Sequence, residues 1–67
     1  MSYWIIQVLR GVYSAYGPYR TKKGAEHRYE KTKGGEIHLW ESWLDGEEDH
    51  EKVIDEFKAS QYEKSGG

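Results

Sequence analysis

The sequence predicts an α+β fold, with a small sheet of two to three strands and two helices in the order β-(β)-α-β-α. Three segments predict it. Residues 3–10, YWIIQVLR, and residues 36–44, EIHLWESWL, have the β-branched and aromatic content of strands. Residues 47–61 instead carry apolar side chains at helical spacing, among them Val53 and Phe57.

The first segment is expected to be a central strand, because its apolar side chains alternate onto both faces. Gly11 then permits a turn, and residues 12–16, VYSAY, are expected to form a shorter second strand paired with the first. Residues 16–19, YGPY, are expected to end that strand in a tight turn, since Pro18 lacks a backbone donor.

The two helices have separate start signals. Thr21 is placed to cap a helix from Lys22 to about Lys33, and Asp45 with Glu48 three residues later indicates a cap for the second helix. Because the first helix separates the two strong strands, as in a βαβ crossover, these strands are expected to be parallel.

Length and composition predict one domain, residues 1–62, with residues 63–67 as a flexible tail. No cysteine is present to stabilise so small a chain, so its stability must come from packing, a metal or a partner. No basic leader opens the chain, and its longest apolar run, YWII, is too short to span a bilayer. A cytoplasmic protein without cofactors or membrane partners is therefore expected.

One pattern links the first strand, the YGPY segment and the first helix. Trp4, Ile6, the YGPY residues, Thr21 and Ala25 resemble the pattern W-x-V, YGPF-x-T, A of small uncharacterised bacterial and bacteriophage proteins. Tyr19 stands where that pattern has Phe. The resemblance covers residues 4–29 and implies a strand, turn and helix-cap unit, and it brings no catalytic residues with it.

The candidate binding residues fall into two groups of opposite charge. Residues 1–35 carry net charge +5 and residues 36–67 carry −7. The basic half places three tyrosines and two cations close together in the sequence: Tyr13, Tyr16, Tyr19, Arg20 and Lys23. Such a surface could stack on single-stranded nucleic acid, or the tyrosines could pack in the core. The sequence pI of about 5.9 argues against nucleic acid.

The acidic half offers a surface for a protein partner. Two tryptophans stand three apart near the end of the second strong strand, and exposed aromatics of this kind anchor protein interfaces, including homodimers. Acidic side chains follow, either to dock on a basic partner or simply as a helix start and a solvated helix face. These candidate residues are Trp40, Trp43, Glu47, Glu48, Glu51 and Asp55.

Catalytic and metal-binding patterns are absent. The three His lack metal-ligand spacing, and the serines lie in no nucleophile motif. The terminal Gly66 and Gly67 match the Gly-Gly tail of ubiquitin-like modifiers and sulfur carriers, although the order of elements differs from theirs. The sequence therefore predicts a small non-enzymatic protein-binding module, and the resemblance makes a phage-type accessory or inhibitor protein one form of it.

Overall fold

The computed structural model describes the backbone of residues 1–66 and the side chains of residues 1–62. Three strands form one antiparallel sheet in the order β2-β1-β3. These strands are β1 (Ser2–Leu9), β2 (Val12–Tyr19) and β3 (Glu36–Ser42). The chain therefore has the α+β fold that the sequence predicts.

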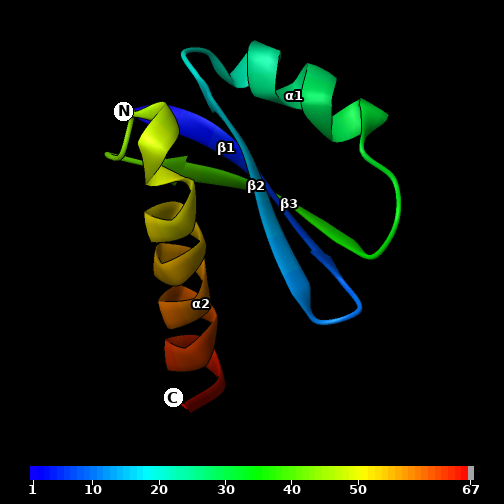
Figure 1. The fold of residues 1–67 in the computed structure, drawn as a ribbon, viewed down its shortest axis with the longest axis vertical. Helices are drawn as coiled ribbons and strands as arrows, with labels where there is room; N and C mark the ends of the chain where they lie inside the picture. Colours follow the sequence, from blue (N-terminus) through cyan, green and yellow to red (C-terminus); the bar gives the residue numbers. More distant parts are fainter. Residues whose placement is uncertain (67) are drawn as a thin grey trace.

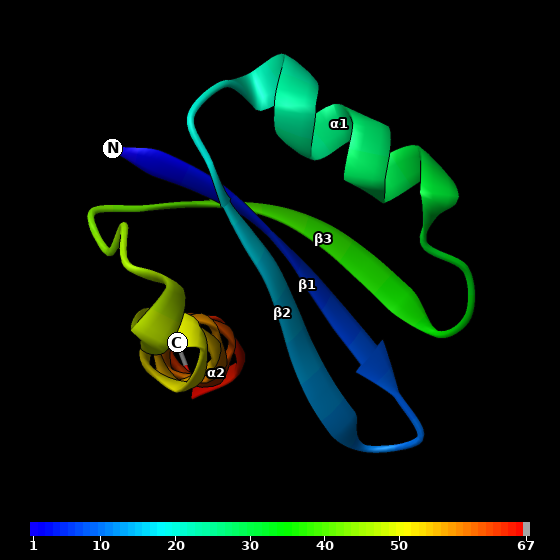
Figure 2. The ribbon, with the colours of Figure 1, turned by 45° about the horizontal axis from the view of Figure 1, so that its top comes forward.

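Two helices cover the two sides of the sheet. α1 (Lys22–Lys31) follows β2, and α2 (His50–Gly66) ends the described chain after a short 3-10 helix, η1 (Glu47–Asp49) (Figure 1). Figure 2 shows the sheet passing between α1 and α2, so that the molecule has three layers.

β1 lies at the centre of the sheet, as its two apolar faces predict. Trp4, Ile5 and Ile6 are completely buried. Trp4 and Ile6 pack with Val53 and Phe57 of α2, whereas Ile5 points to the opposite face, toward α1. Each helix is therefore held against one face of the same strand.

The prediction that β1 and β3 run parallel is wrong, because both β2 and β3 pair antiparallel with β1. β2 is a full strand, so the chain has already reversed once, at Arg10 and Gly11, before α1 begins. The crossover through α1 consequently joins β2 to β3, which run in the same direction on either side of β1.

The predicted turn at residues 16–19 is also wrong, since β2 continues through this segment to Tyr19. The pairing moves from Ile5 opposite Tyr16 to Tyr3 opposite Tyr19, which inserts one extra residue into β2 as a bulge. The Gly17–Pro18 peptide bond is cis. β2 tolerates Pro18 because it is an edge strand, where a missing N–H breaks no ladder hydrogen bond.

α1 begins where the sequence predicts. The Thr21 hydroxyl oxygen accepts a hydrogen bond of 3.1 Å from the Gly24 N–H, so Thr21 is the N-cap. The helix ends at Lys31, two residues earlier than expected, and the Thr32 hydroxyl donates to the Arg28 carbonyl oxygen at 2.7 Å. Ala25 is its one buried residue.

The cap that the sequence predicts for the second helix lies one residue later and belongs to η1, whereas α2 itself begins at His50. Asp49, rather than Glu48, accepts a hydrogen bond, of 3.2 Å, from the backbone N–H of Gly46, rather than from that of Asp45. The helix then continues to Gly66, beyond the expected end near Gln61. The predicted flexibility of residues 63–67 stays a prediction, and Gly67 lies outside the described residues.

Aromatic rings form a large part of the core between the sheet and α2. The Phe57 ring centroid lies 4.9 Å from that of His38 and 5.3 Å from that of Trp40, both on β3. His50 packs edge-on against Trp4 at 5.1 Å, and the Trp4 indole N–H donates to the Leu44 carbonyl oxygen at 2.9 Å. These contacts hold α2 and the segment before it against the sheet.

Gly35 provides a test of how closely the start of β3 approaches β1. It has φ of +68°, and a Cβ there would clash with the Val8 carbonyl oxygen, whereas Gly11, with φ of +77°, has open space around it. Gly11→Ala and Gly35→Ala both force alanine into left-handed backbone, but Gly35→Ala adds a steric clash. We expect Gly35→Ala to lower the free energy of unfolding by roughly 1–3 kcal/mol more than Gly11→Ala.

Urea unfolding followed by tryptophan fluorescence measures both variants. Equal losses of stability would show that β3 does not approach β1 so closely at Gly35.

Candidate functional site

The three tyrosines that the sequence groups together do not form one surface. Tyr13 lies on the α2 side of the sheet, where its ring centroid is 6.3 Å from that of Phe57. Tyr16 and Tyr19 contact Arg28 of α1 on the other side. All three tyrosines are half-buried, so the sheet divides the predicted cluster.

Each of these tyrosines already has a cationic neighbour within the fold. The Lys58 ammonium lies 4.5 Å from the centroid of the Tyr13 ring, and the Arg28 guanidinium lies 5.0 Å from that of Tyr16. Arg28 Nε also donates to the Tyr19 hydroxyl oxygen at 3.2 Å. This hydrogen bond is the main cause that raises the pKa of Arg28 above its ordinary value.

Gln7 is a polar residue of β1 that the sequence analysis missed. Its side-chain oxygen accepts from the Tyr16 hydroxyl at 3.0 Å, and its amide nitrogen donates to the carbonyl oxygens of Lys33 at 2.9 Å and Gly34 at 3.0 Å. It thereby ties β2 to the loop that leads into β3. The sequence did contain a sign of this role, because Gln7 is the one strongly polar side chain between the apolar residues of YWIIQVL.

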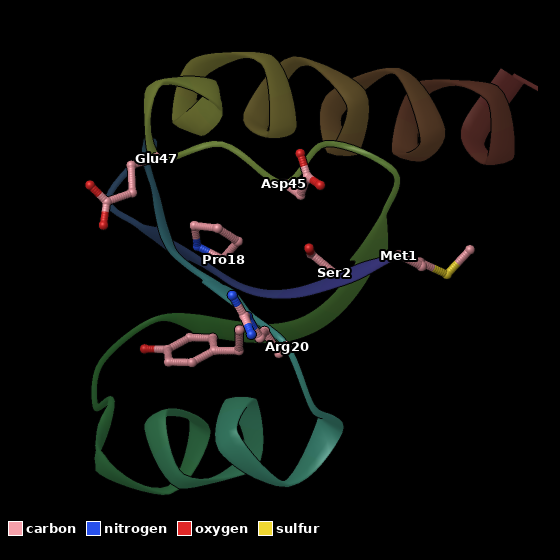
Figure 3. A pocket seen from close by; sticks show the side chains of 7 residues that line it. Met1, Ser2, Pro18, Arg20, Asp45 and Glu47 are labelled. Atoms are coloured by element: carbon pink, nitrogen blue, oxygen red, sulfur yellow. The ribbon is translucent and has the colours of Figure 1, made fainter.

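Arg20 and Lys23 are both exposed, and Arg20 lines an open hollow of about 470 Å³ at one end of the sheet. Asp45 and Glu47 also line the hollow. In Figure 3 these two acidic residues lie on the side of the hollow nearer α2, and Arg20 lies on the side nearer α1. The hollow therefore brings basic and acidic residues from the two halves of the sequence to one place.

The two candidate tryptophans occupy different environments. Trp40 is half-buried against Phe57, and its indole N–H donates to Glu56 Oε1 at 2.8 Å. Trp43 follows the end of β3 and is 79% exposed. Trp43 is therefore the one of the pair that is available to a partner.

The acidic candidates stay at the surface. All four are exposed along η1 and the first two turns of α2: Glu47, Glu48, Glu51 and Asp55. Within residues 1–62, Lys52 forms an ion pair with Asp49 at 3.6 Å and His38 Nε2 lies 3.3 Å from Glu36 Oε1, and neither contact joins α1 to α2. The opposite charges of the two halves are therefore not neutralised by direct pairing across the fold.

A second hollow, of about 410 Å³, lies between α1 and the outer edge of β3. It is lined by Glu26, Tyr29, Ile37, His38 and Leu39. Ile37 and Leu39 are half-buried, and Tyr29 is 46% exposed. The apolar side chains here are next to a strand edge that no other described strand covers.

No group of three or more His, Cys, Asp or Glu within the described residues could hold a metal ion. Nor does any described helix combine the length and the apolar character needed to cross a membrane. Comparisons with protein-family models, curated proteins and solved structures find no match for this chain. The surfaces themselves therefore provide the evidence on function.

The exposure of Trp43 can be measured by fluorescence quenching. Acrylamide quenches exposed indoles in preference to buried ones, and Trp4 is buried while Trp40 is half-buried. We expect Trp43→Phe to reduce the slope of the quenching plot for the remaining fluorescence, because the most accessible indole is removed. Trp40→Phe is the matched control, and a larger reduction in that control would contradict the assigned exposures.

Proposed function

We propose that this protein is a small non-enzymatic binding module that recognises a basic surface on another protein. Its contact surface consists of Trp43 and the exposed acids Glu47, Glu48, Glu51 and Asp55, which we call the acidic-aromatic surface. A phage-type accessory or inhibitor protein that blocks or adapts a host protein is one form of this function.

One observation carries this proposal: the basic residues of α1 and the acidic residues of α2 lie on opposite sides of the sheet and, among the side chains that the structure describes, form no ion pairs with each other. A simpler explanation of the sequence pattern is that the two halves attract each other in the fold. The sheet instead lies between α1 and α2, and no ion pair within residues 1–62 joins these helices (Figure 2). The acids of α2 thus remain available to steer a basic partner by long-range attraction.

Trp43 supplies the apolar part of the surface. It lies in the loop that connects β3 to η1, two residues before Asp45. Tryptophan is enriched among the residues that dominate interface energies, since burial of its large ring removes much apolar area from water. An exposed tryptophan that lies two residues from both Glu41 and Asp45 in the sequence fits a basic partner that also presents an apolar pocket.

A pair of charge reversals tests the surface. Glu51→Lys with Asp55→Lys reverses two exposed acids spaced i and i+4 on α2, and Glu26→Lys with Glu30→Lys makes the same change on α1. We expect the α2 variant to lose capture of partner proteins from a host lysate, and the α1 variant to retain it. Thermal unfolding by circular dichroism establishes that both variants are folded.

Trp43→Ala tests the aromatic contact separately. We expect it to weaken binding to the captured partner by ~30-fold or more, the loss typical of an interface hot spot. Binding that survives both Trp43→Ala and the α2 reversal would place the contact surface elsewhere.

Single-stranded nucleic acid is the alternative ligand. The surface of α1 carries exposed Lys22 and Lys23 beside Arg20, which favours it, but Tyr13 is separated from Tyr16 and Tyr19 by the sheet. We expect a labelled single-stranded oligonucleotide to show no binding at ~50 mM salt, where the electrostatic contribution is strong. Binding that weakens as salt rises, and is lost in Arg20→Glu with Lys23→Glu, would favour the nucleic-acid function instead.

A further inference from the structure

We infer that the outer edge of β3 is a dimerisation surface, on which a second copy of this chain adds its own β3 in antiparallel orientation. The two sheets would join into one of six strands, in the order β2-β1-β3-β3-β1-β2. This contact uses the backbone edge of β3, whereas the acidic-aromatic surface lies on Trp43, η1 and α2, beyond the end of that strand.

The two edges of the sheet differ in how they are protected. β2 carries Pro18, which has no N–H to offer a neighbouring strand, and the bulge beside it interrupts the regular spacing of the edge. β3 has neither proline, glycine nor bulge over its seven residues, and its pairing with β1 is regular throughout. An edge of this kind exposes backbone donors and acceptors that another strand can pair with.

Apolar side chains next to this edge are also only partly covered. Ile37 and Leu39 point to the α1 side, where they line the hollow of about 410 Å³ together with Tyr29. Trp40 points to the other side and is half-buried. A strand added to β3 would therefore cover apolar surface on both faces of the sheet, in addition to forming backbone hydrogen bonds.

The sequence of β3 is complementary to itself in one register. A two-fold axis perpendicular to the sheet relates the two antiparallel copies of β3 and keeps α1 on the same side of the sheet in both. All seven residues of β3 find a partner only when this axis passes through Leu39, the middle residue of the strand. Leu39 then faces Leu39 of the second copy, and His38 faces Trp40. Glu36 and Glu41 face Ser42 and Ile37 respectively, so no two carboxylates are opposite each other.

This register also provides a size for the contact. Seven residues in an antiparallel strand span about 24 Å, which is comparable to the 32 × 26 × 20 Å extents of the whole chain. The shared edge would therefore run along most of one side of the molecule.

Two lysine substitutions distinguish this arrangement from other modes of association. Leu39→Lys would place two lysines opposite each other at the two-fold axis, whereas Ile37→Lys would place each lysine opposite Glu41 of the other copy. Both positions are half-buried and on the same face of the strand, so we expect the two substitutions to lower the stability of the folded monomer by similar amounts. We expect Leu39→Lys to be monomeric and Ile37→Lys to remain dimeric.

Sedimentation equilibrium over a concentration series up to ~1 mM, the weak limit of specific association, measures the mass of each protein. We expect wild type to be dimeric at the upper end of the series. Mixing Leu39→Lys with Leu39→Glu should restore a dimer, because opposite charges then meet at the axis. A monomeric wild type, a dimeric Leu39→Lys, or equal loss of the dimer in both lysine variants would overturn the inference.

Cross-linking provides a measurement that does not require a charge on the strand. The chain has no cysteine, so Leu39→Cys introduces one thiol per copy, which the proposed register brings together at the axis. Ile37→Cys is the control, because its two thiols would be ~14 Å apart along the strands. Mild oxidation should give a disulfide-linked dimer with Leu39→Cys only, and equal cross-linking of both variants would count against the register.

Partner capture by monomeric Leu39→Lys separates the two proposals. A variant that no longer dimerises but still captures a partner leaves the acidic-aromatic surface in place. A wild-type protein that dimerises as expected but captures no partner protein would refute the proposed function and leave the dimerisation surface supported.

Discussion

The burial of β1 on both faces is the constraint on which the rest of the fold depends. Trp4, Ile5 and Ile6 are consecutive and fully buried, so water must be excluded from both sides of the sheet at once. One helix can cover only one face, and a chain of 67 residues has room for little more than two helices. The three-layer arrangement in Figure 2 follows from this. Trp4 and Ile6 pack against α2, and Ile5 points to the opposite face, which α1 covers.

The same constraint separates the charges of the two helices. The helix that covers one face comes from the basic half of the sequence, and the helix that covers the other comes from the acidic half. Because a buried layer of apolar side chains lies between them, their charges cannot approach closely enough to form ion pairs. The acids around Glu51 and Asp55 consequently face solvent, and their field acts on whatever approaches from that side.

The sequence predicts the elements of this fold better than it predicts their connections. The central position of β1, the Thr21 cap and the apolar stripe of α2 follow from local side-chain patterns, and all three are present. Strand direction depends instead on which strands the crossover through α1 joins, and these are β2 and β3, because β2 has already reversed the chain. The length of β2 was underestimated as well, since Gly17 with Pro18 indicated that it ended early. An edge strand can accept these residues, but the local sequence does not say which strands are edges.

The candidate site shows the same limit at the level of single side chains. Simple alternation along β2 would place Tyr19 on the face of Tyr13. The bulge inserts one residue between them, so that Tyr19 lies opposite Tyr3 and joins Tyr16 beside Arg28. The closeness of the three tyrosines in the sequence therefore suggested one surface, whereas the strand register puts Tyr13 on one face of the sheet and Tyr16 with Tyr19 on the other. The bulge that places Tyr19 beside Tyr16 is also, with Pro18, what protects the edge of β2 and leaves β3 as the edge that another strand can join.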